Sequence, residues 1–521
     1  MMRQILAKID TLAETDCSVG VAKFFRRAAF VFVLLMAAAA PHSIAATQTA
    51  WLLGMLCWIC SLVIGGQDEL KFGLPGRLLA AYFIWSAVSS ALSYEPIVSL
   101  DKLRGASVFL IFPFVVNVIR NRKAVILAAG ILIFSGLVGA LYAPLQKIIG
   151  RGIEVHGLES GGLLASKGVS EGDTLLAANG VKTTRPEDVI ARIEVDGSAR
   201  IDVYRTDAPF TIEIRRDELP QSTEAANSRL GFEAYRRSSN FRVSGFYGHY
   251  TTFAEAVQLI ASLCFGLLIA AVRGRAGRSI IALLCTATLT FILALLLTVT
   301  RGSQAAFVIS AFSITALGGG RRILLIVVAL AAIASAVGLF VLHNQRGVGF
   351  ADFQDGSVKY RQMMWRDGSR LLIQSPRNLV YGVGMDSIKT HWEEWGLFDK
   401  GWQPMGHFHS TPLQIAVERG LPALLLWFAV LVVYARSLLR GIRRVRNAEW
   451  VTLGILLGCF GGLVGFVAGG FVHYNLGDTE VAMIFYFLMG ISIRLSDIVL
   501  DESSSRGHSA EIHKNLTPQE I

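Results

Sequence analysis

Gly406-His407-Phe408-His409-Ser410-Thr411-Pro412-Leu413-Gln414 is the stretch around which the rest of the chain can be arranged. It ends a polar, aromatic-rich segment and leads directly into an apolar run. A histidine pair at such a boundary is expected at a membrane interface, where an imidazole can still titrate. Two other polar corners, 241–246 and 298–303, also border apolar runs. The topology of the chain decides whether these corners share one face of a membrane.

The composition is that of a polytopic membrane protein. Of the 521 residues, 53% are hydrophobic and only 17% are charged, whereas a soluble protein carries about 25% charged residues. The formal net charge of +10 does not indicate nucleic-acid binding, because the basic residues gather at the ends of apolar runs. The cysteine pair Cys57 and Cys60 lies inside an apolar run, so we interpret its CxxC spacing as packing rather than metal or redox chemistry.

Apolar runs long enough to cross a membrane recur along the chain. A spanning helix needs about 20 mainly apolar residues, and by that measure the chain has about twelve spans. The predicted spans are 28–44, 48–65, 75–93, 105–119, 124–143, 250–272, 279–299, 303–318, 323–342, 412–435, 450–471 and 479–496. Every second connection is basic, beginning with Lys23, Arg26 and Arg27 before the first span. This pattern predicts that both termini are cytoplasmic.

The connections divide the chain into predicted domains. Two long segments, 144–249 and 343–411, face outward in this topology. The predicted order is 1–143 with helices 1–5, 144–249 as a periplasmic insertion, 250–342 with helices 6–9, 343–411 as a long periplasmic loop, 412–496 with helices 10–12, and 497–521 as a cytoplasmic tail. We expect the 343–411 loop, which is rich in tryptophan and phenylalanine, to form short amphipathic helices, and the polar tail to be mobile.

The 144–249 insertion is predicted to be a small α+β domain. Residues 200–205 and 210–214 alternate as strands do, 186–193 form a helix with proline in its first turn, and Asn179-Gly180 indicates a tight turn. The run 168–180 resembles a bacterial PDZ domain, which implies a peptide or protein partner. The expected peptide-binding loop near 153–158 lacks the usual Gly-hydrophobic repeat, so strand addition and a spacer or docking role both stay open.

The predicted topology places Arg242, Arg301 and His409 at the outer ends of spans. An arginine near the hydrocarbon boundary is costly unless it pairs with an anion, and its guanidinium suits bidentate contact with phosphate. A single such arginine is explained by snorkelling to lipid headgroups. Two arginines in polar corners, together with a histidine, favour an anion-binding site.

Four motifs resemble the conserved corners of the O-antigen ligase/O-antigen polymerase superfamily. They are Arg242-Val243-Ser244-Gly245-Phe246, Thr298-Val299-Thr300-Arg301-Gly302-Ser303, the Arg361 to Trp365 segment with Gly382-Val383-Gly384, and His409-Ser410-x-x-Leu413-Gln414-x-x-x-Glu418-x-Gly420. The order and spacing agree over residues 242–496. Ser410 stands where many members have asparagine, and the PDZ-like insertion is not part of the usual family plan.

The resemblance implies an all-α, GT-C-like integral-membrane glycosyltransferase acting on the periplasmic face of a bacterial inner membrane. The implied donor is a glycan on undecaprenyl diphosphate, and in ligases the acceptor is lipid A-core. Arg242 and Arg301 would stabilise the diphosphate leaving group, and His409 would take the proton of the attacking hydroxyl in an inverting displacement. Further candidates for substrate binding are Arg361, Arg377, His407, His249, Asn475 and Asp478.

The sequence predicts no metal and no other cofactor. The outward carboxylates are scattered and lack ligand spacing; they are Asp352, Asp355, Asp367, Asp386, Glu393, Glu394 and Asp478. A zinc protease is set aside, because 391–395 lacks the second histidine of His-Glu-x-x-His. Three other functions stay open: an O-antigen polymerase, a protein O-oligosaccharyltransferase, and, from another class, a lipid-linked glycan transporter.

Overall fold

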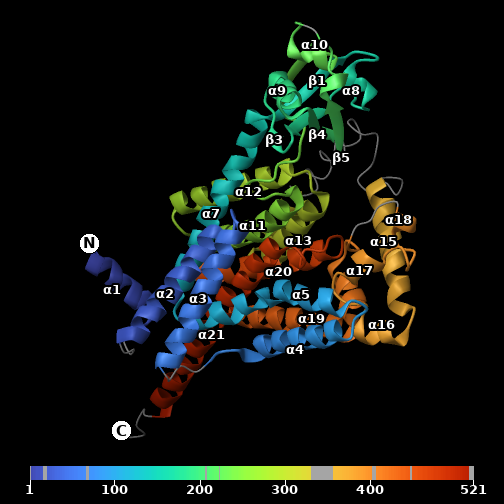
Figure 1. The fold of residues 1–521 in the computed structure, drawn as a ribbon. Coiled ribbons are helices and arrows are strands. Elements are labelled where there is room, and N and C mark those ends of the chain that lie inside the picture. The colour runs from blue at the N-terminus through green and yellow to red at the C-terminus, as the bar shows by residue number, and fades with distance from the viewer. Residues whose placement is uncertain are drawn as a thin grey trace, which may run out of the picture. The chain divides into compact units, whose positions relative to one another are not determined.

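The computed structural model describes residues 2–15, 20–65, 70–205, 208–221, 223–329, 356–401, 406–445 and 449–515. The chain divides into two compact units, which are described separately. The helical unit comprises Met1–Ala140 and Phe246–Ile521, and the sheet unit comprises Leu141–Gly245. Figure 1 shows the helices and strands in chain order.

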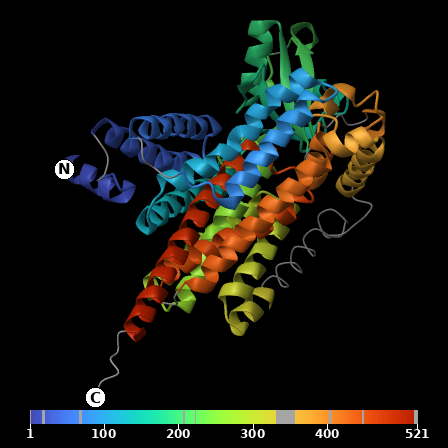
Figure 2. The same ribbon diagram turned by 90° about the horizontal axis from the view of Figure 1, so that it is seen from below.

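Helices account for nearly all of the first unit. They are α1 (Met2–Ala13), α2 (Gly20–Ala39), α3 (Ile44–Gly65), α4 (Gly73–Ala91), α5 (Pro96–Ala106), η1 (Ser107–Leu110), α6 (Ile111–Val118), α7 (Arg122–Ile149), α11 (Tyr250–Arg273), α12 (Arg278–Leu297), α13 (Arg301–Gly318), α15 (Gly356–Ile373), α16 (Pro376–Tyr381), α17 (Ser387–His391), α18 (Phe398–Gly401), α19 (Thr411–Arg444), α20 (Trp450–Gly470) and α21 (Thr479–Asn515). Helices α19 and α21 run side by side (Figure 2).

The chain is a polytopic, mostly helical membrane protein. Within the described residues, seven helices are long and apolar enough to cross a membrane, and these are α3, α7, α11, α12, α19, α20 and α21. The apolar character of these helices confirms the predicted fold class. The count of about twelve spans stays a prediction, and most of the span expected at 323–342 lies outside the described residues.

Two helical predictions need correction. The span expected at 105–119 is not one helix, because the chain there passes from α5 through the short η1 to α6, which carries Pro113 inside it. Proline removes a helical hydrogen bond and interrupts a continuous helix. The boundary predicted at residue 497 is also wrong, because α21 continues as helix to Asn515. The predicted mobility of the tail stays a prediction, and residues 516–521 lie outside the described residues.

Small residues bring α11 and α20 into backbone contact. A Cβ added at Gly266 would lie 2.3 Å from the Gly458 nitrogen, and one added at Gly458 would lie 2.5 Å from the Leu263 Cα. Helices in membranes approach closely where glycines remove the side chains between them. This packing places the start of α11 beside the turn that follows α20, where Glu255 contacts His473.

The sheet unit is an antiparallel α+β domain. Its strands are β1 (Arg151–Leu158), β2 (Thr174–Ala178), β3 (Val181–Lys182), β4 (Ser198–Arg205), β5 (Ala208–Arg215) and β6 (Phe232–Ser238). They pair in the order β5-β4-β2-β1-β6, with β3 on β2, and the unit also holds α8 (Leu163–Ser166), α9 (Pro186–Asp196), η2 (Arg216–Glu218) and α10 (Ala226–Leu230). The predicted helix and strands are all present.

Strand β1 bears on the expected peptide-binding function of the sheet unit. It pairs with β6 from Arg151 to Leu158, but with β2 only at Ile153 and Glu154. Strand addition needs an unpaired edge. Peptide binding by this unit and its resemblance to a PDZ domain both stay predictions.

The 343–411 segment forms helices in its described part, of which α16, α17 and α18 are short and α15 has 18 residues. Within its described part, α15 to α18 surround an apolar cluster that includes Met364, Leu371, Phe398 and Phe408, all nearly inaccessible to solvent. Residues 343–355 and Trp402 lie outside the described residues. Phe408 belongs to this cluster, so the cluster fixes the position of the histidine pair just before the start of α19.

Candidate functional site

The histidine pair is positioned by the residue between its members. Phe408 is fully buried in the aromatic cluster, and its backbone N–H donates to the Gln414 Oε1 at 2.8 Å. His409 follows with a φ of 47°, in the left-handed region. The chain then begins α19, with Pro412 in the first turn. His407 and His409 therefore flank a buried anchor, and their rings lie 4.3 Å apart between centroids.

The first turns of α19, which follow the histidine pair, pack against the loop formed by residues 382–386. Gln414, Glu418 and Gly420 belong to these turns. The Val383 N–H donates to the Val417 carbonyl at 2.8 Å, and the Asp386 N–H donates to the Glu418 Oε1 at 3.1 Å. Gly420 has a φ of 78°, and a Cβ there would lie 1.9 Å from the Val380 carbonyl oxygen. The motif residues after His409 thus hold the backbone of this corner in place, and Gln414 and Glu418 also line the cavity described below.

The turn between α20 and α21 brings a third histidine to the same place. The His473 carbonyl accepts hydrogen bonds from the Thr411 backbone N–H at 3.2 Å and from its hydroxyl at 3.1 Å. The His473 ring lies 5.6 Å from the His409 ring and 6.2 Å from the His407 ring. His407, His409 and His473 are called the histidine cluster below.

A buried carboxylate holds the third member of the cluster. The Glu255 Oε1 lies 2.8 Å from the His473 Nδ1, and Glu255 is only 6% exposed. Asp478 lies beside this pair and accepts a hydrogen bond from the Thr252 hydroxyl at 2.9 Å. Glu255 and Thr252 come from the first turns of α11, which its packing on α20 holds next to the α20–α21 turn.

Members of the cluster differ in charge because their neighbours differ. Burial, together with His407, His473 and Arg361, lowers the pKa of His409 to about 2, and burial lowers the pKa of His407 to about 4. Burial also opposes charge on His473, but Glu255 more than offsets it and the pKa of His473 is raised. Burial, reinforced by Glu255, raises the pKa of Asp478 to about 6. His409 is therefore a neutral imidazole at pH 7, whereas Glu255 favours the protonated form of His473.

The histidine cluster opens on a cavity of about 1050 Å³. Its lining comes from α3, α4, α5, η1, α11, α17, α19, α21 and the connecting loops. The charged, histidine and amide side chains of the lining are Gln48, Asp101, Lys102, Arg104, His249, Asp386, Lys389, His407, His409, Gln414, Glu418, Arg419, His473 and Asp478. A cavity of this size and polarity is suited to a polar group larger than a single ion.

Four of the predicted residues line this cavity: His249, His407, His409 and Asp478. His249 is also the N-cap of α11, since its Nδ1 accepts a hydrogen bond from the Thr251 N–H at 3.3 Å. These four come from separate parts of the sequence, and the helical unit brings them together.

Two predicted arginines lie beside the cluster. The Arg361 Nε donates to the Val472 carbonyl at 3.3 Å, one residue before His473. Arg301 is the first residue of α13, and a Cβ added to the following Gly302 would lie 3.2 Å from the Val472 side chain. Both arginines therefore approach the α20–α21 turn, although neither lines the cavity.

The remaining predicted residues have other surroundings. Arg377 lies 4.1 Å over the Tyr94 ring and donates to the Leu92 carbonyl, away from the cavity lining. Asn475 is 2% exposed and joins the Thr411 hydroxyl to the Phe466 carbonyl, each at 2.8 Å. Asn475 therefore links the α20–α21 turn to the start of α19 and to α20 by hydrogen bonds. Arg242 belongs to the sheet unit, so its convergence with Arg301 and His409 stays a prediction.

Glu255, His473 and Arg419 belong to the site but were not predicted from the sequence. Arg419 is 6% exposed, lines the cavity and donates to the Tyr82 hydroxyl. Among the described residues its Nε has no hydrogen-bond partner. One signal was present for Glu255, because a carboxylate inside a predicted span is a functional candidate by default.

Glu255, His473 and Asp478 form a group that could hold a metal ion. One ligand atom from each lies within 4.8 Å of the others. A carboxylate, an imidazole and a second carboxylate are ligands that zinc and related ions accept. The sequence-based prediction that no metal is bound rested on other carboxylates and took neither Glu255 nor His473 into account. It stays a prediction.

Comparison with known families adds an independent observation. Residues 286–428 match the family model described as O-Antigen ligase. The matched region includes Arg301, Arg361, Arg377, His407 and His409 and stops before the α20–α21 turn. A search of curated proteins found no match. The family match confirms the resemblance seen in the motifs, and it does not extend to the sheet unit.

Proposed function

We propose, from the match of residues 286–428 to the O-Antigen ligase family model, that this protein transfers a glycan from undecaprenyl diphosphate to an acceptor hydroxyl. The proposed acceptor is lipid A-core, and the proposed site is the histidine cavity on the periplasmic face of the inner membrane. The observation that carries the proposal is the histidine cluster itself, buried beside Glu255 at the wall of the 1050 Å³ cavity.

The proposed reaction is a single displacement at the anomeric carbon. The acceptor oxygen bonds to that carbon, the carbon–oxygen bond to the diphosphate breaks with its electron pair, and the configuration inverts. The hydroxyl proton passes to His409, which is neutral and therefore able to accept it. A bound diphosphate would place negative charge near His409. This charge would raise the pKa of His409 toward neutral pH, at which the reaction takes place. The Glu255, His473 and Asp478 group offers the route by which the proton leaves.

Negative charge grows on the diphosphate as its bond to the glycan breaks. In the proposal Arg301 and Arg242 stabilise this charge, as a metal ion does in other transferases. Arg419 adds a cation at the cavity wall that is already desolvated, so its interaction with a phosphate oxygen is stronger than it would be in water. The proposal does not use a metal.

The discriminating experiment uses the purified protein in lipid vesicles with an undecaprenyl-diphosphate-linked glycan. Separate arms offer lipid A-core, the growing glycan and an acceptor protein, which distinguish a ligase, a polymerase and a protein O-oligosaccharyltransferase. A final arm follows movement of the glycan lipid across the vesicle without transfer, as a transporter would show. A chelator arm tests metal independence, which predicts an unchanged rate.

Arg301 provides the matched variants for this assay. Arg301→Ala should reduce transfer about 10²–10³-fold, the range seen when one group that stabilises transition-state charge is removed. Arg301→Lys should retain only a small part of the wild-type transfer rate, because lysine lacks the bidentate geometry of arginine. Full activity of Arg301→Ala would contradict its proposed role at the leaving group.

A further inference from the structure

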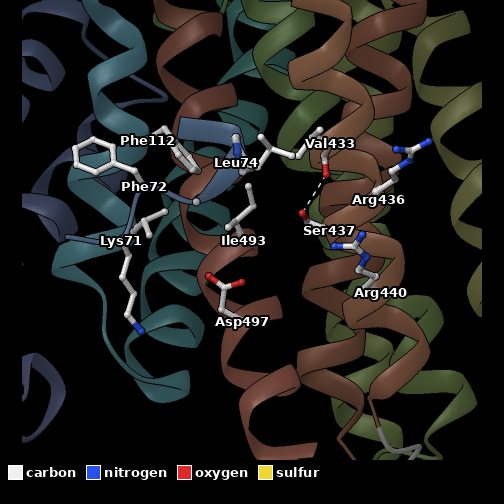
Figure 3. A pocket seen from close by; sticks show the side chains of 13 residues that line it. Lys71, Phe72, Leu74, Phe112, Val433, Arg436, Ser437, Arg440, Ile493 and Asp497 are labelled. Carbon is white, nitrogen blue, oxygen red and sulfur yellow. Dashed lines mark hydrogen bonds between the residues drawn. The ribbon is translucent and has the colours of Figure 1, made fainter. Parts of the chain in front are cut away.

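A second pocket, of about 220 Å³, lies at the other end of the same helices. It is formed where the start of α4 and one side of α6 face α19 and α21 (Figure 3). The helix α21 begins at Thr479 beside the histidine cavity. Asp497, which lines the second pocket, lies on the order of 27 Å further along α21 at 1.5 Å per residue. The two pockets are therefore separate sites.

Charged side chains of both signs line the second pocket. Lys71, Arg436 and Arg440 are cationic, and Asp497 is anionic. Figure 3 shows Asp497 and the Arg440 guanidinium turned toward the space between α21 and α19, whereas the Arg436 guanidinium points outward. Over the described part of the chain, none of these four side chains has an ion-pair partner within 4.0 Å. Asp497 interacts electrostatically with Arg494 and Lys71 over a longer distance. Direct contacts to Asp497 and Arg440 therefore remain available to a bound group.

Apolar surface adjoins these charges. At the rim, Phe72 is 39% exposed and Leu74 is 50% exposed. Deeper in the pocket, Phe112 and Ile493 are buried. The combination of a charged pocket and an exposed apolar rim at the end of membrane helices matches a ligand that is polar at one end and hydrocarbon at the other.

We propose that this pocket binds the headgroup of a glycerophospholipid that carries a primary ammonium, as phosphatidylethanolamine does. The phosphodiester contacts Arg440, because guanidinium groups bind phosphate oxygens strongly. The ammonium contacts the Asp497 carboxylate, and the acyl chains leave past Phe72 and Leu74. This assignment accounts for both signs of charge in the pocket. A purely anionic headgroup would account for the cations alone.

Native mass spectrometry of the full-length protein tests the proposal. The detergent-purified protein is incubated with phosphatidylethanolamine, phosphatidylglycerol or phosphatidylcholine, and bound lipid is counted. Wild type should retain phosphatidylethanolamine in preference to both others, since choline has no N–H to donate and phosphatidylglycerol has no cation for Asp497. Arg440→Gln should weaken retention about tenfold, because it removes a charge-assisted contact.

Two further variants make the result specific. Asp497→Asn should keep phospholipid binding but lose the preference for phosphatidylethanolamine over phosphatidylcholine. This variant still tests the proposal if Arg440→Gln does not fold. Arg443→Gln is the matched control, because Arg443 is an exposed arginine of the same helix that does not line the pocket. Equal retention of all three lipids by wild type would overturn the proposal. An equal loss in Arg440→Gln and Arg443→Gln would also overturn it.

Discussion

His409 and His473 have opposite pKa shifts although their rings lie 5.6 Å apart. The difference comes from Glu255, which contacts His473 alone among the three histidines of the cluster. A buried carboxylate that stabilises one imidazolium leaves the neighbouring rings neutral, since like charges in a low-dielectric site repel. The cluster therefore contains a neutral imidazole at His409 and a second imidazole, His473, whose charged form is favoured by Glu255.

Asp478 gives this electrostatic arrangement a measurable pH dependence. Its folded-state pKa of about 6 lies above the ordinary 3.8. The folded state thus binds the proton more tightly than the unfolded state, and the resulting stability is full below 3.8 and is lost as the pH rises through about 6. Asp478→Asn is neutral at every pH, so it should be more stable than wild type above pH 6 and similar below 3.8.

Thermal unfolding midpoints over this pH range check the prediction. Asp217→Asn, at an exposed carboxyl of the sheet unit, is the control variant. A difference between Asp478→Asn and wild type that stays constant with pH would show that the carboxyl is not held in its neutral form by the site.

At the residue scale, the sequence predicted those site residues that lie together in one local motif. His407 and His409 adjoin each other in one motif, so their shared location followed from the spacing. The Glu255–His473 contact joins residues on different helices that no motif connects, and only the packing of α11 on α20 brings them together. Asn475 was expected near the substrate because of its turn, but its amide is used to hold Thr411 and Phe466.

At the element scale, α19 bends at Gly420, where a φ of 78° and a ψ of 170° interrupt the helical backbone. This bend lets the first turns of α19 carry Gln414 and Glu418 beneath the corner, while the remainder of the helix runs through the bundle. Trp85 supports the bend, since its Nε1 donates to the Arg419 carbonyl at 2.9 Å. The site geometry depends on this interrupted helix.

Gly420→Ala should destabilise the protein by more than about 2 kcal/mol, because it adds both backbone strain and a clash. The added Cβ would lie 1.9 Å from the Val380 carbonyl oxygen, which is backbone and cannot rotate away. Gly277→Ala is the matched control, since a Cβ there meets no atom within 4 Å. Thermal unfolding of both variants provides the measurement. A midpoint for Gly420→Ala equal to that of Gly277→Ala would contradict the account of the bend.

At the scale of the whole molecule, the orientation in the membrane is a prediction that labelling can test. Lys182→Cys lies on an exposed strand of the sheet unit, and Ser504→Cys lies on the exposed end of α21. In a background without the native cysteines, an impermeant maleimide added to intact spheroplasts should modify the first and not the second. Reaction should occur at both after permeabilisation. Modification of Ser504→Cys in intact spheroplasts would reverse the predicted orientation.

Hydropathy predicted the fold class because spanning helices are recognised by length and apolarity alone. It predicted one helix at 105–119, where Pro113 and the η1 turn divide the chain, and an end of the last helix at residue 496, where α21 continues. These errors concern helix continuity, which depends on neighbouring helices as well as on local composition. The order of strands in the sheet unit, with β1 between β2 and β6, was also not predicted, because strand pairing is a non-local property.

The most direct test of the central claim is the transfer rate of His409→Ala, measured with purified protein, lipid-linked glycan and acceptor, alongside binding of the glycan lipid. The account predicts a fall of about 10²–10⁴-fold with binding retained, because the variant lacks the group that accepts the proton of the attacking hydroxyl. A transfer rate equal to that of wild type would contradict the account and remove His409 as the proposed base.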